Sequence, residues 1–313
     1  MRICRPSGTG TTFTDNGRMR TLNFGALALS AALFLSACGD DSVKPDPAPV
    51  AQKPVKVGIA LGGGAAKGFA HIGVIKMLEA NGIKPAVVSG TSAGSLVGAL
   101  YASGMSPYDM QTKAVELDES RIRDISLFSG GLIKGQALQN YVNAQVQNKT
   151  FQQMRKPFVA VATRLDNGDR VLFSRGNVGQ AVRASCSIPG VFEPVKIKNI
   201  SYVDGGVVSP VPVDAAKALG ADIVIAVDIG SAPIKGQTPT SMLGVVNQSV
   251  MIMGRKLGQQ ELSRADVVIR PNVNSIGATD FDSRAKAILE GEKAAQAALP
   301  AIRRAIAAKQ KAR

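Results

Sequence analysis

Residues 87–94 read Val-Val-Ser-Gly-Thr-Ser-Ala-Gly, and a helix-forming run of small residues, Ala93–Ser103, overlaps and follows them. The segment Gly90–Gly94 matches G-x-S-x-G, the pattern of a sharp turn between strand and helix that exposes a nucleophilic serine. A chain with 33 glycines can produce this pattern by chance, and Ser92 would then only cap the helix. The apolar strand before the turn and the helix after it favour a nucleophile.

Strand and helix patterns alternate on both sides of this turn. We predict strands at 55–61, 86–89, 158–164, 170–174, 223–227 and 267–270, and a strand-rich stretch at 192–203. Helices are predicted at 67–81, 93–103, 107–117, 136–147, 178–184, 213–219, 242–262 and from 283 onward. The order predicts an α/β fold with three α/β/α layers, in which helices cover both faces of a mainly parallel central sheet. No linker interrupts the pattern, so residues 55–313 are expected to form one domain.

The beginning of the chain has the composition of an export signal. Residues 22–37 are almost wholly apolar or small, follow Arg18 and Arg20, and end directly before Cys38. We therefore expect residues 1–37 to be a signal peptide. Its first 18 residues are polar and too long for a charged leader, and Met19 is a better start than Met1.

Cys38 follows Leu-Ser-Ala, which resembles the lipobox of bacterial lipoproteins, in which the cysteine is diacylated. The alternative is an ordinary secretory signal with a chance cysteine. Residues 38–54 are predicted to be the lipidated cysteine and a proline-rich tether. Gly39 stands where some lipoproteins carry an inner-membrane retention aspartate. We expect an exported protein on the periplasmic side of the bacterial cell envelope, anchored in the outer membrane.

The charge balance restricts the partners. The formal net charge of +14 suits a nucleic acid or an anionic membrane, although a solvated basic surface gives the same count. Export and the absence of tryptophan argue against a nucleic acid, so membrane phospholipid is the favoured partner. The end of the chain, 301–313, is basic and is expected to be a helix that either lies on a membrane or is simply solvated.

A glycine cluster at Gly62–Gly68 follows the first predicted strand. It lacks the Gly-Lys-Ser/Thr ending of a P-loop, and a dinucleotide fingerprint needs a third glycine where Lys67 stands. The remaining interpretation is an oxyanion hole, in which backbone N–H groups stabilise the negative charge of a tetrahedral intermediate. Lys67 is a possible source of positive charge at the same place, or is solvated.

A serine nucleophile needs a base, and the chain has one histidine, His71. Either His71 completes a triad or a carboxylate acts directly in a Ser-Asp dyad. Asp204 follows an apolar strand and precedes two glycines, although Asp-Gly is also a favoured turn pair. Asp228 ends a buried strand, where α/β sheets gather their sites. The residues alone give Asp204 a modest preference.

Four segments in order resemble the motifs of the patatin-like phospholipases: Leu61–Gly68, His71–Val74, Gly90–Gly94 and Asp204–Gly206. Ala184–Val195 also resembles a segment that these proteins carry before the catalytic aspartate. The resemblance implies a dyad of Ser92 and Asp204, an oxyanion hole formed by Gly62, Gly63 and Gly64, a structural His71, and neither metal nor cofactor. It further implies hydrolysis of acyl esters of phospholipids or lysophospholipids through an acyl-enzyme.

Two other functions remain open on the sequence. An acyltransferase would pass the acyl group to a lipid or protein acceptor, but such enzymes with G-x-S-x-G usually supply a distant second histidine, which is absent here. A non-catalytic lipid-binding envelope lipoprotein would have lost its site. The intact Ser92, Asp204 and glycine cluster argue against that loss. Nothing in the sequence fixes the oligomeric state.

The predicted anchor is testable by fractionation. Cys38→Ser removes the only thiol that the lipobox would acylate, so the protein should move from the membrane fraction to the soluble fraction. Cys186→Ser, which removes a thiol far from the signal, should leave the distribution unchanged. A Cys38→Ser protein that stays entirely with the membranes would contradict the acyl anchor.

Overall fold

The computed structural model describes residues 54–118, 124, 133–230 and 240–313. The predicted signal peptide, Cys38 and all but the last residue of the tether lie outside this range. The described residues belong to one compact unit, Ala51–Arg313, with its own hydrophobic core. None of the helices described in it has the length and apolar character needed to cross a membrane.

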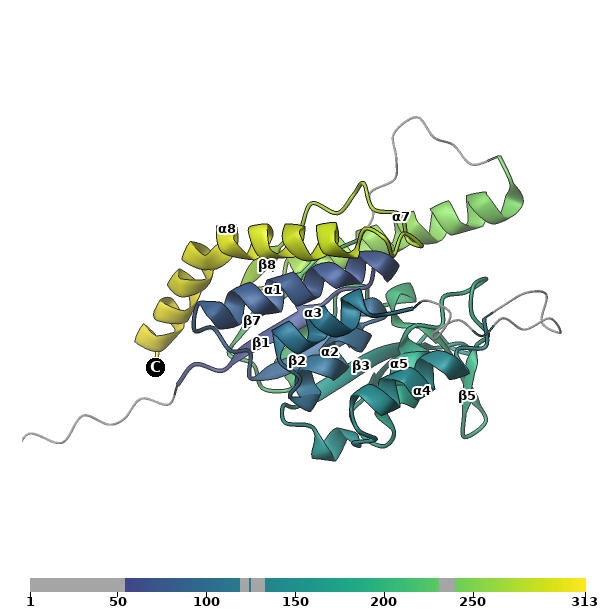
Figure 1. Cartoon of the computed structure of the whole chain (residues 1–313), viewed down its shortest axis with the longest axis horizontal. Coiled ribbons are helices and arrows are strands. Elements are labelled where there is room, and N and C mark those ends of the chain that lie inside the picture. The colour runs from purple at the N-terminus through teal and green to yellow at the C-terminus, as the bar shows by residue number, and fades with distance from the viewer. Residues whose placement is uncertain (1–53, 119–123, 125–132, 231–239) are drawn as a thin grey trace, which may run out of the picture. The chain divides into compact units, whose positions relative to one another are not determined.

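A single sheet runs through this unit in the order β5-β6-β3-β2-β1-β7-β8, with β4 paired to β3 (Figure 1). Strands β3, β2, β1, β7 and β8 are parallel, whereas β4, β5 and β6 pair in antiparallel fashion at one side. The bounds are β1 Val57–Leu61, β2 Val87–Thr91, β3 Phe158–Arg164, β4 Arg170–Phe173, β5 Val195–Ile197, β6 Ile200–Asp204, β7 Ile223–Val227 and β8 Val267–Ile269.

The helices of the described residues cover both faces of the sheet (Figure 1). They are α1 Phe69–Ala80, α2 Ala93–Ser103, α3 Pro107–Val115, α4 Gln136–Gln145, α5 Val178–Ser185, α6 Val213–Ala218, α7 Met242–Leu262 and α8 Arg284–Lys311. Short 3-10 helices lie at η1 Ala65–Gly68, η3 Phe151–Gln153 and η4 Gly205–Val207. Helix α8 lies along α1 in Figure 1.

The alternating side chains of β1 contribute to a different hydrophobic core on each face of the sheet. Ile59 and Leu61 of β1 point into the large core that includes α1, α2 and α8. Ala60, between them, belongs to a second core on the opposite face, with residues of α6 and with Leu262 at the end of α7. Successive side chains of a strand point to opposite faces, so both faces of β1 are covered. The predicted three-layer α/β/α fold with a mainly parallel sheet is confirmed.

Two boundaries differ from the sequence prediction in ways that matter for the site. Strand β2 continues to Thr91 rather than ending at Ser89, because Gly90 and Thr91 still pair with β1 and β3. Ser92 is therefore the first residue after the strand. The helix predicted from residue 67 begins instead as the 3-10 turn η1, which connects the glycine cluster to α1.

The contact between α1 and α8 depends on two glycines. A Cβ on Gly73 would overlap the carbonyl oxygen of Ile288, and one on Gly291 would overlap that of Ala70. Both collisions involve helix backbone, which cannot move aside without shifting the whole helix. Glycine is therefore required at this crossing, although it normally weakens a helix.

We predict that Gly73→Ala lowers the free energy of unfolding by about 1–3 kcal/mol or more, since the added methyl group overpacks the crossing. The matched control is Gly254→Ala within α7, where a Cβ would meet no atom closer than 3.7 Å. This control should be neutral or stabilising by up to about 1 kcal/mol, because alanine favours a helix. Urea unfolding measures both, and equal stabilities of the two variants would contradict the packing argument.

Candidate active site

Ser92 occupies a sharp turn between β2 and α2. Its backbone has φ 53° and ψ −126°, in the region that side chains other than glycine rarely adopt. A Cβ on Gly90 would overlap the backbone of Gly94, and a Cβ on Gly94 would overlap the carbonyl of Leu61. Both flanking glycines of the G-x-S-x-G segment are thus needed for this turn. Such strain commonly marks a functional residue.

Ser185, the last residue of α5, fixes the backbone of this turn by a hydrogen bond. The Ser92 N–H donates to Ser185 Oγ at 2.9 Å, and the Ser185 hydroxyl donates to the carbonyl of Val161 in β3 at 2.5 Å. The side chain is fully buried. Sequence reasoning missed Ser185 as an individual residue. The only available signal was its place in the segment Ala184–Val195.

Asp204 ends β6 and lies in the same cavity as Ser92. Its Oδ1 accepts the N–H of Gly206 at 2.7 Å, while the buried Oδ2 has no hydrogen-bond partner within the described residues. Burial raises the pKa of this carboxyl to about 6, against the lowering effect of the Ser92 side chain and the Gly206 N–H. Asp204 thus has an unpaired carboxyl oxygen in the cavity that Ser92 lines, as a general base for Ser92 would need.

The glycine cluster lies against the turn. A Cβ on Gly63 would come within 3.3 Å of Ser92 Cβ. Gly62 N–H donates to the carbonyl of Val227, and Gly63 N–H donates to that of Pro210, both at 3.0 Å. These two N–H groups are therefore engaged, which differs from the oxyanion hole that the resemblance implies.

The N–H groups of Gly64 and Ala65 have no acceptor in the described part of the chain. Both residues line the cavity with Ser92. Gly64 directly precedes η1, and Ala65 is the first residue of η1. Ala65 has φ 52°, so the backbone is strained here as well. Two adjacent N–H groups without an acceptor, on residues that line a cavity, are groups of the kind that stabilises a developing oxyanion. Ala65 was not among the residues that the sequence indicated.

His71 and Lys67 are not among the residues that line the cavity. His71 Nε2 lies 2.8 Å from the carbonyl oxygen of Gly62, so this nitrogen carries the proton and donates. Burial lowers the pKa of His71 to about 4, and the imidazole is neutral at physiological pH. It supports the glycine cluster. Lys67 is buried within η1, and burial lowers its pKa too.

The cavity lined by Ser92 and Asp204 has a volume of about 450 Å³. Apolar residues from three segments line it: Ile188 and Pro189 from the loop after α5, Val207 and Val211 from the loop after Asp204, and Val250, Met251 and Leu262 from α7. Asp228 also reaches the cavity. Its Oδ2, however, pairs with Arg270 at 3.3 Å, and its Oδ1 accepts the N–H of Gly230 at 3.0 Å. Asp204 is the carboxylate left available to Ser92.

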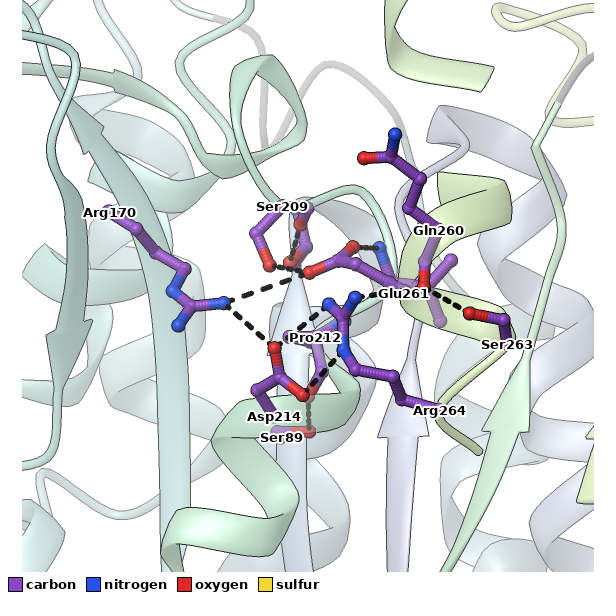
Figure 2. Close-up of polar contacts among 11 residues, drawn as sticks. Ser89, Arg170, Ser209, Pro212, Asp214, Gln260, Glu261, Ser263 and Arg264 are labelled. Carbon is purple, nitrogen blue, oxygen red and sulfur yellow. Dashed lines mark hydrogen bonds and ion pairs between the residues drawn. The ribbon is translucent and has the colours of Figure 1, made fainter. Parts of the chain in front are cut away.

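A buried carboxylate ties α7 to the loop after Asp204 (Figure 2). Glu261 Oε1 accepts the Ser209 hydroxyl at 2.5 Å, and Oε2 accepts the Val211 N–H at 2.8 Å. Arg264 makes two hydrogen bonds to Asp214 nearby, at 2.9 and 2.8 Å. Strand β2 also binds this loop. The Ser89 hydroxyl donates to the carbonyl of Pro212, and the Thr91 hydroxyl donates to the carbonyl of Ser209.

The same loop touches the glycine cluster, because the carbonyl of Pro210 accepts the Gly63 N–H. One loop, 205–212, therefore contacts β2, which ends directly before Ser92, as well as the glycine cluster and α7. In the part of the chain that the structure describes, no group of three or more His, Cys, Asp or Glu side chains could hold a metal ion.

Comparison with known proteins yields a family-model match to patatin-like phospholipase over residues 59–217, half of the chain. An uncharacterized NTE family protein of Mycobacterium tuberculosis is 34% identical over 179 residues, which cover 56% of this chain and 50% of the relative. A second one from that organism is 30% identical over 271 residues, covering 78% and 46%. The chain thus spans about half the length of these relatives.

Among solved structures, VipD from Legionella pneumophila matches with a TM-score of 0.56 at 16% identity. The match covers 80% of this chain and 67% of that one. At this identity the likeness concerns the fold alone, and it agrees with the three-layer arrangement.

The raised pKa of Asp204 gives a stability prediction. Burial favours the protonated carboxyl, so the folded state binds more protons than the unfolded state between pH 4 and about 6. The Asp204 contribution to stability is therefore lost as the pH rises through about 6. Asp204→Asn should be more stable than the wild type at pH 8, by about 2–3 kcal/mol, and similar to it at pH 4.

Chemical denaturation at the two pH values measures this difference. Asp228→Asn is the control, since that carboxylate is paired with Arg270. A wild type that is as stable as Asp204→Asn at pH 8 would show that ionised Asp204 carries no cost in the fold.

Proposed function

The chain belongs to the patatin-like phospholipase family, and from that premise we propose that it is a serine acyl hydrolase acting on phospholipids or lysophospholipids. Ser92 is the nucleophile and Asp204 the base. The observation that carries this proposal is one cavity that joins a strained serine, a buried carboxylate with an unoccupied oxygen, and two unpaired N–H groups.

In the first half of the reaction, ionised Asp204 accepts the hydroxyl proton of Ser92 as Oγ attacks the ester carbonyl. The negative charge that forms on the carbonyl oxygen is stabilised by the N–H groups of Gly64 and Ala65. One such donor is typically worth about 3 kcal/mol. The tetrahedral intermediate then breaks its ester C–O bond. Asp204 returns the proton to the leaving alcohol, and the acyl group remains on Ser92.

In the second half, Asp204 takes a proton from water, and the resulting hydroxide attacks the acyl-enzyme at the same carbonyl. Collapse of the intermediate releases the fatty acid and restores the Ser92 hydroxyl. A single carboxylate is sufficient because each half-reaction removes one proton and gives one back. His71 takes no part, since its Nε2 proton is engaged by Gly62.

The cavity supports a lipid acyl chain as the substrate group. Its volume of about 450 Å³ falls in the range of ligand sites, and its walls carry valine, isoleucine, leucine and methionine side chains. The polar lining residues include Ser92 and Asp204, where the ester would react, and also Asp228, Arg255, Gln259, Arg270 and Asn274. The apolar wall would take the acyl chain, with its ester carbonyl at Ser92 and Asp204.

The dyad makes a prediction for turnover of p-nitrophenyl acyl esters. Ser92→Ala and Asp204→Asn should each lower kcat/KM by about three orders of magnitude or more, because the two groups act as one unit. Asp228→Asn should stay within about tenfold of the wild type, since its carboxylate is already paired. The wild-type rate should rise with pH through about 6 and then level off, as Asp204 ionises.

Each variant should be compared at matched folded fraction, measured by circular dichroism. A Ser92→Ala protein as active as the wild type would end the hydrolase proposal. An inactive Asp228→Asn beside an active Asp204→Asn would instead transfer the role of base to Asp228.

A further inference from the structure

The N-terminal two-thirds of α7 carry an exposed apolar surface. Six side chains with exposed fractions from 38% to 57% make up this surface, called the α7 patch below: Val245, Val246, Val250, Met251, Ile252 and Met253. Six exposed apolar side chains within nine residues of one helix are unusual on a surface that meets only water, and such groups generally mark an interaction site.

The other end of α7 is fixed to the domain. Gly258, Glu261 and Leu262 are buried, and Glu261 holds the loop after Asp204 through two hydrogen bonds. Figure 1 shows the helix extending from this point past the sheet, with its beginning far from the core. The patch is therefore presented outward on a helix whose base is anchored at the active site.

The α7 patch is continuous with the catalytic cavity. Val250 and Met251 belong to the patch and also line the cavity that contains Ser92 and Asp204. An apolar chain could therefore pass from the outside of α7 to the nucleophile along apolar side chains.

The charged residues near the α7 patch indicate which kind of partner binds it. No acidic residue occurs between Met242 and Gln260, whereas the exposed Arg255 and Lys256 follow the patch directly. A second copy of this stretch of α7 offers no carboxylate to pair with these two cations, whereas lipid phosphates complement them. An apolar surface bordered by basic residues is typical of helices that lie in a membrane interface.

We propose that the α7 patch docks into the surface of an anionic phospholipid membrane and delivers the acyl chain of a lipid past Val250 and Met251 to Ser92. The proposal rests on the proposed function for the delivery step, whereas docking itself needs no catalysis. It assigns to α7 a membrane contact that is separate from the predicted anchor at Cys38.

The test uses residues 39–313, which contain the whole compact unit without the predicted signal. In the α7 variant, Val246, Ile252 and Met253 are all replaced by glutamine. None of the three lines the cavity. The matched control carries Val115→Gln, Leu165→Gln and Leu289→Gln, which are similarly exposed at 60%, 52% and 47% on other parts of the surface. Binding is measured by sedimentation with vesicles of phosphatidylglycerol and phosphatidylethanolamine.

We expect the α7 variant to bind these vesicles about tenfold or more weakly than the wild type, with the control unchanged. Hydrolysis of a soluble p-nitrophenyl ester should be the same in all three proteins. Equal vesicle binding by the α7 variant and the wild type would overturn the proposal. So would a wild-type dimer, by light scattering, that the α7 variant loses while its vesicle binding is unchanged.

A second measurement does not depend on a triple variant. Met253→Cys, labelled with an environment-sensitive fluorophore, should report an apolar environment when vesicles are added, and the same label at Leu289→Cys should not. Absence of a change at residue 253 would overturn docking. Ser92→Ala should bind vesicles like the wild type. Vesicle binding by a wild type that hydrolyses no ester would contradict the proposed function and leave the docking intact.

Discussion

The backbone conformation of Ser92 is the constraint on which the site depends. A residue held at φ 53° and ψ −126° costs on the order of 1–3 kcal/mol and persists only where its surroundings impose it. The surroundings here are the closely packed backbones at Gly90 and Gly94, and the Ser185 hydroxyl that accepts the Ser92 N–H. With the turn fixed in this way, the serine side chain projects into the cavity instead of along the sheet.

The other parts of the site are linked by the loop 205–212. It follows Asp204, the proposed base, supplies the carbonyl that accepts the Gly63 N–H, and is held by Glu261 near the end of α7. Figure 2 shows the part of this hydrogen-bond network that joins β2, the loop and α7.

Much of the fold could be predicted because it depends on local pattern. The bounds of α2, β7 and α7 agree with the prediction, since hydrophobic periodicity and helix caps are local signals. The roles of Ser185 and Glu261, and the engagement of the Gly62 and Gly63 N–H groups, could not be predicted. They depend on which carbonyl or hydroxyl the packed sheet brings opposite each group, and residues far apart in sequence supply these partners.

The central claim is that Ser92 is the nucleophile, and covalent labelling tests it most directly. The protein is treated with an alkyl fluorophosphonate, and the modified residue is located by peptide mass spectrometry. We predict one adduct, on the peptide that contains Ser92, and none after Ser92→Ala. The strongest contradiction would be an unlabelled Ser92 peptide with an adduct at another serine. Such a result would mean that the strained turn serves the fold and that the chemistry lies elsewhere.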